Sequence, residues 1–157
     1  MCLHSLLIIT IYYALLRLPN AVVQRVDYNH KYPFLEQLKT THNSDILMSM
    51  HGSGLTHLLF LPKWAAVFEI YNCDDVNCYA DLARLRGVKY FTWQRQELVK
   101  VVYDNGSFIN DQPHPKFANY ILDKDEFVRL TSEVTFHSTL PFRILVNSKY
   151  SKNIEIS

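Results

Sequence analysis

The stretch from Ile46 to Ile70 reads ILMSMHGSGLTHLLFLPKWAAVFEI and contains the pattern that decides the fold. It begins with an apolar run of strand length, Ile46–Met50, and ends with a second, Ala65–Ile70. Between them, a glycine-containing turn leads into leucines at 55, 58 and 59, which share one helical face. Strand, turn, helix and strand in this order are typical of a parallel sheet, because parallel strands need a crossover connection.

The same alternation continues on both sides of this stretch. Upstream, the sequence predicts a β-branched strand over Ala21–Tyr28 and a short helix over Phe34–Thr41. Downstream, it predicts a helix over Tyr79–Arg86 that ends at Gly87 as its C-cap, followed by a strand over Val88–Trp93. The expected fold class is therefore α/β, with a Rossmann-like parallel sheet flanked by helices.

The second half of the chain has weaker patterns. Residues 104–119 are polar and rich in turn formers, which predicts a surface loop. A helix is predicted from Asp123 to about His137, with Asp123 and Glu126 placed like a capping pair. No element is predicted after Pro141. We expect one sugar-nucleotide-binding domain over residues 21–140, preceded by an apolar start (1–20) and followed by a tail (141–157).

Composition narrows the function classes. The 157 residues are 48% hydrophobic and 20% charged, which is typical of a globular chain and excludes a disordered one. The formal net charge is +1, and the chain has no long run of lysine and arginine. Nucleic acid is therefore not expected as a partner, because the basic surface that phosphate backbones attract is missing.

The first residues leave two alternatives open. Leu6–Leu18 is an apolar stretch whose length is nearer to that of a signal peptide than to a membrane span. No lysine or arginine precedes it, and no small-residue cleavage pattern follows before Pro19. The alternative is a buried helix over residues 14–18 that stops at Pro19. Membrane association is left open by the sequence.

The glycine turn is the strongest candidate for chemistry. It follows the carboxyl end of a predicted strand, where ligands bind in open parallel sheets. Gly52 and Gly54 let the backbone approach a ligand closely, and the amides of a helix starting near Leu55 suit a phosphate or diphosphate. A tight turn that needs positive φ explains the same two glycines without any ligand.

Two ionisable residues flank this turn. Glu69 lies at the end of the next predicted strand, near the spacing of about 20 residues at which dinucleotide-binding units hold a ribose diol. A solvated carboxylate at a strand end is the alternative. His51 could donate to a phosphate, act as a general base, or be a strand-end histidine satisfied by a carbonyl. His57, on the following helix, is predicted to be structural.

The spacing of two cysteines gives information on the cellular compartment of the protein. Cys73 and Cys78 are spaced for a small disulfide loop and unlike the paired cysteines of a zinc ribbon, so no metal site is predicted. A disulfide would indicate an oxidising compartment, in which Asn105, Gly106 and Ser107 form a glycosylation acceptor. Two reduced thiols are the alternative.

The segments His51–Pro62 and Trp64–Glu69, followed by Tyr71–Cys73, together resemble glycosyltransferase family 61. The resemblance extends over about residues 21–120. It implies a two-domain fold of the GT-B type, in which this chain is the carboxyl-terminal, donor-binding half. It also implies a location in the endoplasmic reticulum lumen or elsewhere in the secretory pathway.

The activity that the resemblance implies is the inverting transfer of N-acetylglucosamine from UDP-GlcNAc to serine or threonine of extracellular EGF-like domains. No cofactor beyond this donor substrate is expected, and divalent cation dependence stays open. His51 would stabilise the departing UDP or lie beside the anomeric centre. Glu69 would hold the ribose. The diphosphate would be cradled by the glycine turn and the residues after it, namely Gly52, Ser53, Gly54, Leu55 and Thr56.

Three departures from the family pattern qualify this expectation. The family chain is several times longer, so this chain resembles a fragment or a reduced paralogue. Ser53 stands where alanine is expected, and Ile154–Ser157 stands where a retrieval signal is expected. A nucleotide-binding module without catalysis, and a family member that uses another donor such as UDP-xylose, are the competing interpretations.

Overall fold

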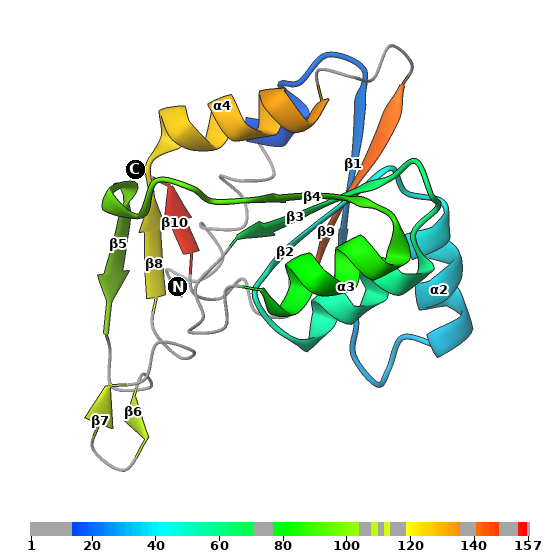
Figure 1. Ribbon diagram of the computed structural model, residues 1–157, viewed down its shortest axis with the longest axis horizontal. Coiled ribbons are helices and arrows are strands. Elements are labelled where there is room, and N and C mark those ends of the chain that lie inside the picture. Colours follow the sequence, from blue (N-terminus) through cyan, green and yellow to red (C-terminus); the bar gives the residue numbers. More distant parts are fainter. Residues whose placement is uncertain are drawn as a thin grey trace.

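The fold is built on a five-stranded parallel sheet (Figure 1). The computed structural model describes residues 14–70, 77–103, 108–109, 112–113, 119–135, 141–147 and 154–156. The central strands β2 (Ile46–Met50) and β3 (Ala66–Ile70) are buried along their full length, as expected of strands covered on both faces. In spatial order the strands are β1 (Ala21–Val26), β9 (Phe142–Asn147), β2 (Ile46–Met50), β3 (Ala66–Ile70) and β4 (Lys89–Thr92).

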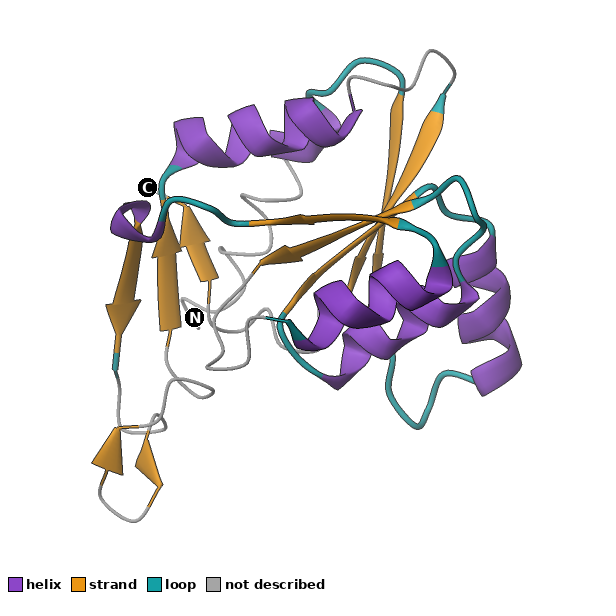
Figure 2. Ribbon diagram, in the orientation of Figure 1, coloured by secondary structure: helices purple, strands orange, loops and turns teal. Residues whose placement is uncertain are grey.

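Helices cover both faces of this sheet (Figures 1 and 2). Three crossover helices lie together on one face, and α4 lies on the other. The predicted α/β class is therefore confirmed. The helices on the first face are α2 (Phe34–His42), the 3-10 helix η1 (Ser53–Phe60) and α3 (Cys78–Arg86), and α4 spans Lys124–Thr135.

Alternate residues of the central strands pack into two separate hydrophobic cores, one on each face of the sheet. Leu47, Val67 and Leu145 point to the face of the three crossover helices and pack with Leu55 and Leu58 of η1. The residues between them in the strands form the second core, which α4 closes. That core includes Met48, Phe68, Ile144, Phe127 and Leu130. The period-two alternation of a strand thus supplies both layers of the fold.

The structure adds a strand where none was predicted. β9 lies between β1 and β2 and pairs in parallel with both. The strand comes from the segment expected to be a tail. Its sequence, FRILVN, lacks polar alternation because both of its faces are covered.

The segment after the glycine turn also differs from expectation. It is a 3-10 helix that begins at Ser53, two residues before the predicted start. The amide of Leu55 donates to the carbonyl of Gly52 at 2.9 Å, an i to i−3 bond that starts this tighter winding. The remaining predicted elements agree within a few residues, and Gly87 is the left-handed C-cap of α3.

A second, smaller sheet adjoins the first. It contains β5 (Val99–Val102), β8 (Asn119–Leu122) and β10 (Ile154–Ile156), and the 3-10 helix η2 (Gln96–Leu98) precedes it. The region predicted as a surface loop contains the short hairpin of β6 (Phe108–Ile109) and β7 (Gln112–Pro113).

In the described part of the apolar start, Leu15 packs into the core with an exposed fraction of 0%, and Ala14 and Leu18 pack against the same core. It lies in a helical segment at residues 14–16. Leu6 and the rest of the apolar stretch before residue 14 lie outside the described residues. Among the helices that the structure describes, none combines the length and apolar character needed to cross a membrane.

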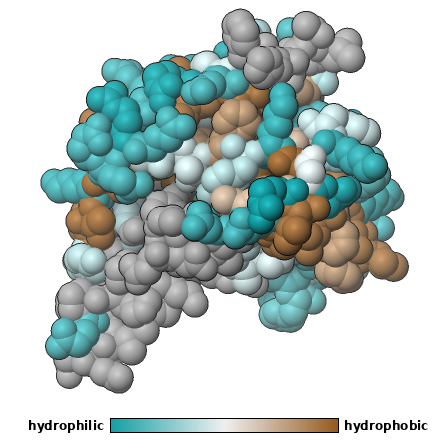
Figure 3. Space-filling view, viewed as in Figure 1, coloured by the Kyte–Doolittle hydropathy of each residue, from teal (hydrophilic) through white to brown (hydrophobic). Residues whose placement is uncertain are grey.

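Apolar side chains also reach the outer surface of the first helical layer. Leu35 and Leu85 are each 76% exposed, and Phe34 is 58% exposed. Figure 3 shows this apolar surface over the region of α2, η1 and α3. The inner side of α2 instead buries Gln37 and Thr41, which hydrogen-bond Tyr28 or the loop before the helix.

Asp123 caps α4, as the sequence predicted. Its Oδ1 accepts a hydrogen bond from the amide of Glu126 at 2.9 Å. We expect Asp123→Ala to lower the free energy of unfolding by about 1 kcal/mol, because an amide of the first turn loses its partner. Asp125→Ala, an exposed change in the same turn, should stay within about 0.5 kcal/mol of the wild type. Urea denaturation measures both, and equal effects would contradict a capping role.

Candidate functional site

The candidate site lies at the carboxyl ends of β2 and β3. Strand register brings polar residues of four neighbouring strands to the same level: Asn147 is paired with Ser49, Ser49 with Glu69, and Glu69 with Thr92. Asn147, Ser49 and Glu69 are each only 2% exposed. We call these four residues the polar row, and it lies directly beneath the glycine turn.

The turn itself offers amide donors. Gly52 has φ 152° and ψ 172°, a conformation that favours glycine over residues with a side chain. Within the part of the chain that the structure describes, the amides of Gly52 and Gly54 have no hydrogen-bond acceptor. Two such amides at the start of a helix favour an anionic ligand, because N–H groups and the helix dipole both point toward it.

Gly54 is also required by packing. A Cβ atom on Gly54 would lie 2.2 Å from Nδ2 of Asn147, so the buried Asn147 side chain would have to move to accept any other residue at this position. The turn therefore rests directly on the polar row. The turn interpretation, which expects positive φ, therefore holds for Gly52 but not for Gly54, whose close contact is with Asn147. Neither observation requires a ligand.

His51 and Glu69 are in direct contact. Nδ1 of His51 hydrogen-bonds Oε1 of Glu69, and the hydroxyl of Tyr90 donates to Oε2 of Glu69 at 2.6 Å. The ring of Tyr79 meets the His51 ring edge to face, at a centroid distance of 5.0 Å. The His51 side chain is 19% exposed, so a ligand can reach it.

This geometry bears on the expected ribose contact of Glu69. The carboxylate is buried, and each oxygen already accepts a hydrogen bond from the protein. Ribose binding by Glu69 stays a prediction. The contacts favour another role, in which the carboxylate orients the His51 ring.

Leu55 and Thr56 use their polar groups within the turn. The Leu55 side chain is fully buried and its amide bonds Gly52. The Thr56 hydroxyl donates to the carbonyl of Ser53 at 2.7 Å, which leaves its oxygen as an acceptor only. Their contribution to a diphosphate cradle stays a prediction, and the amides of the turn are the better donors.

His57 has the surroundings of a structural residue, in agreement with the sequence. Its Nδ1 lies 3.2 Å from the Gly54 carbonyl, and its Nε2 lies 3.1 Å from Oε1 of Gln37. The ring stacks on Tyr28 with centroids 4.3 Å apart. Burial raises the pKa of Tyr28 to about 12, against the lowering effect of its hydrogen bond to Thr41, so the phenol stays neutral. His57 thus joins η1 to α2 beneath the turn.

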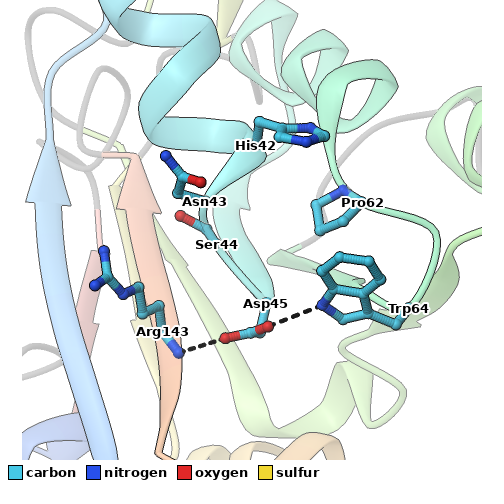
Figure 4. Close-up of a pocket in the computed structure, with 7 residues that line it drawn as sticks. All are labelled: His42, Asn43, Ser44, Asp45, Pro62, Trp64 and Arg143. Carbon is cyan, nitrogen blue, oxygen red and sulfur yellow. Dashed lines mark hydrogen bonds between the residues drawn. The ribbon is translucent and has the colours of Figure 1, made fainter.

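A hollow of about 490 Å³ lies at the opposite ends of the strands (Figure 4). Asp45 precedes β2 and accepts hydrogen bonds from the indole of Trp64 at 3.0 Å and from the Arg143 amide at 2.8 Å. These bonds join the starts of β2, β3 and β9. The hollow is therefore separate from the glycine turn, which follows the carboxyl end of β2.

The other candidate residues of the sequence give no further site. Among the residues that the structure describes, no three His, Cys, Asp or Glu side chains gather to hold a metal ion. Cys73, and with it the predicted disulfide to Cys78, lies outside the described residues, as does the glycosylation acceptor at Asn105.

Sequence reasoning missed Tyr90, Tyr79, Ser49 and Asn147. Tyr90 and Tyr79 were visible as members of a predicted strand and helix, but their contacts with Glu69 and His51 depend on strand register and helix placement. Asn147 lay in a segment without predicted elements. A polar residue at the end of an otherwise apolar run, as in Ser49, is the one signal that pointed toward the polar row.

The chain is similar to known proteins of one glycosyltransferase family. Residues 11–68 match the model of Glycosyltransferase 61. The chain is 53% identical over 135 residues to the EGF domain-specific O-linked N-acetylglucosamine transferase of Xenopus laevis, covering 83% of this chain and 26% of that protein. The protein of the same name in Drosophila melanogaster is 52% identical over 136 residues, with the same coverage.

The mammalian comparison gives a similar result. The protein of that name in Canis lupus familiaris is 57% identical over 116 residues, covering 73% of this chain and 22% of the relative. The chain thus spans about a quarter of the length of the curated relatives that it matches. No solved structure matches it.

Proposed function

We propose, from the premise that this chain is a relative of glycosyltransferase family 61, that it is the sugar-nucleotide-binding part of a glycosyltransferase. The observation that carries the proposal is the glycine turn. The amides of Gly52 and Gly54, which have no hydrogen-bond acceptor among the described residues, lie beside His51 at the carboxyl end of a parallel sheet. This is the position at which open α/β sheets bind nucleotides.

The proposed donor is UDP-GlcNAc, and the proposed acceptor is a serine or threonine of an EGF-like domain. Both come from the printed name of the relatives and are proposals for this chain. We further propose that the chain is the carboxyl-terminal half of a GT-B-type enzyme of the secretory pathway, in which another domain holds the acceptor.

The proposed reaction is an inverting displacement. The acceptor oxygen attacks the anomeric carbon from the side opposite UDP, the bond from that carbon to the diphosphate oxygen breaks, and the acceptor hydroxyl proton goes to a base. In-line geometry of this kind requires that the leaving group is held in place. The amides of Gly52 and Gly54 stabilise the negative charge that develops on the diphosphate.

His51 acts on the same leaving group in this proposal. Its Nδ1–H bonds Glu69, so the second ring nitrogen, Nε2, carries out the chemistry. In the transfer step Nε2 carries a second proton, taken up from solvent, and gives it to the departing diphosphate oxygen, while Nδ1–H stays bonded to the Glu69 carboxylate. The base that takes the acceptor proton belongs to no residue that we identify in this chain.

Ser53 offers the cleanest test of donor binding, because its side chain is exposed in the turn. We expect the folded chain to bind UDP and UDP-GlcNAc in preference to ADP. Ser53→Glu should weaken UDP binding at least about tenfold, since it adds a negative charge next to the amides that meet the diphosphate. Isothermal titration calorimetry at constant ionic strength measures these affinities.

Ser53→Gln is the matched control. It has nearly the size of the glutamate variant without its charge, so its UDP affinity should stay within about threefold of the wild type. Equal binding of UDP and ADP, or no binding of UDP by the folded chain, would contradict the proposal. A preference for UDP-xylose would retain nucleotide binding but replace the proposed donor.

Catalysis is tested separately. The corresponding segment of the Xenopus laevis relative is replaced by this chain, and transfer of labelled GlcNAc to a folded EGF-like domain is measured. Transfer by the chimera would support a catalytically competent donor half. UDP binding without transfer would favour the non-catalytic module.

A further inference from the structure

Tyr90 is the residue that completes the surroundings of Glu69. It lies on β4, its ring packs against the core beneath α3, and its hydroxyl donates to Oε2 of Glu69 at 2.6 Å. Strand register explains this reach. Glu69 is paired with Thr92, and Tyr90 lies two residues earlier on the same face, so the phenol extends along the strand to the carboxylate.

A buried carboxylate needs such donors. Glu69 is 2% exposed, and an ionised carboxylate removed from water is unfavourable unless its oxygens are hydrogen-bonded. Here Oε1 meets Nδ1 of His51 and Oε2 accepts from Tyr90. If Oε2 had no donor, nothing would fix that side of the carboxylate, and the group would rotate. The rotation would remove the fixed acceptor that His51 has at Nδ1.

We propose that Tyr90 is a positioning residue that acts through Glu69: by holding the carboxylate in place, it keeps the proton of His51 on Nδ1 and directs Nε2 to the ligand. The contacts among Tyr90, Glu69 and His51 determine the His51 tautomer without a ligand. The importance of this tautomer for catalysis rests on the proposed function. Tyr79 supports the same ring from its edge, so His51 is held both in position and in protonation pattern.

The experiment is ¹⁵N NMR of the histidine-labelled full chain. The chain has seven histidines, and loss of one signal set in His51→Gln assigns His51. For the neutral His51 ring of the wild type, without nucleotide, we expect the proton on Nδ1 alone and an Hδ1 that exchanges slowly with water. In Tyr90→Phe we expect a mixture of tautomers and an Hδ1 exchange rate at least about tenfold faster, because a hydrogen bond to a charged group is lost.

Tyr28→Phe is the matched control. It also removes a tyrosine hydroxyl in contact with buried partners, Thr41 and the Gln37 carbonyl, but it does not touch Glu69. Its His51 signals should remain as in the wild type. An unchanged His51 tautomer and exchange rate in folded Tyr90→Phe, or the same change in Tyr28→Phe, would overturn the proposal.

If Tyr90→Phe fails to fold, the wild type and Glu69→Gln together still decide the question. The Tyr90 hydroxyl proton should exchange slowly, and its signal should shift in Glu69→Gln. Rapid exchange, or no shift, would overturn the proposal. UDP titration of the same samples tests the proposed function separately from the positioning role of Tyr90. If the tautomer behaves as expected but UDP does not bind, the proposed function fails and the positioning role stands.

Discussion

Leu145→Ala is expected to lower the free energy of unfolding by about 3 kcal/mol, because a fully buried leucine is cut back in a site that cannot collapse around it. Leu145 is 0% exposed and packs with Leu47 and Val67 of the neighbouring strands. Its strand, β9, has partners on both sides, so the surrounding backbone cannot move in to fill the cavity. Urea denaturation followed by circular dichroism measures the change as a lower midpoint at an unchanged slope.

Arg143→Ala is the control within the same strand. The Arg143 side chain is exposed, and the contact that joins it to Asp45 is made by its backbone amide, which the substitution retains. Its stability should remain within about 0.5 kcal/mol of the wild type. Equal stabilities of the two variants would contradict the central position of β9.

Substitution of Gly54 is expected to have the second large effect. This effect is a loss of stability, which must be measured before any change in ligand binding is interpreted. Gly54→Ala is expected to lower the free energy of unfolding by about 2 kcal/mol, because the new Cβ overlaps Nδ2 of Asn147. Gly54→Trp should cost more than about 4 kcal/mol, since the indole has no space between the turn and the polar row. Thermal and urea denaturation of both variants measure the loss.

The clash partner supplies the control. Asn147→Gly removes the side chain that the new Cβ would meet, so the double variant Gly54→Ala with Asn147→Gly should be more stable than the sum of the two single changes predicts. We expect a coupling of at least about 1 kcal/mol. Additive effects would show that another contact limits the turn. Loss of UDP binding in Gly54→Trp has no bearing on the site unless the variant is shown to be folded, and Ser53→Glu avoids this difficulty.

The local elements were predictable because their signals are local. Ile46–Met50 was predicted with its observed bounds, since an apolar run that ends in a glycine turn has few alternatives. Gly87 was recognised as a C-cap because the left-handed conformation favours glycine, and Asp123 as an N-cap because its oxygen must reach an orphan amide. These features depend on residues within one or two helical turns.

β9 could not be placed in this way. A strand covered on both faces has no polar alternation, and its neighbours β1 and β2 lie about a hundred residues earlier in the chain. The 3-10 winding of η1 was missed for a related reason, because leucines at 55, 58 and 59 fit one helical face in either type of helix. Pattern alone cannot distinguish them.

The candidate site likewise has features that the sequence predicts and others that only the tertiary structure shows. By itself, the sequence determined that a glycine turn follows a buried strand, that His51 and Glu69 lie at neighbouring strand ends, and that the chain resembles one family. Only the tertiary structure decided that Glu69 meets His51 and Tyr90, and that Gly54 rests on Asn147. The reason is physical: residue type and spacing set the elements, whereas contacts between side chains depend on strand register and order, which long-range packing selects.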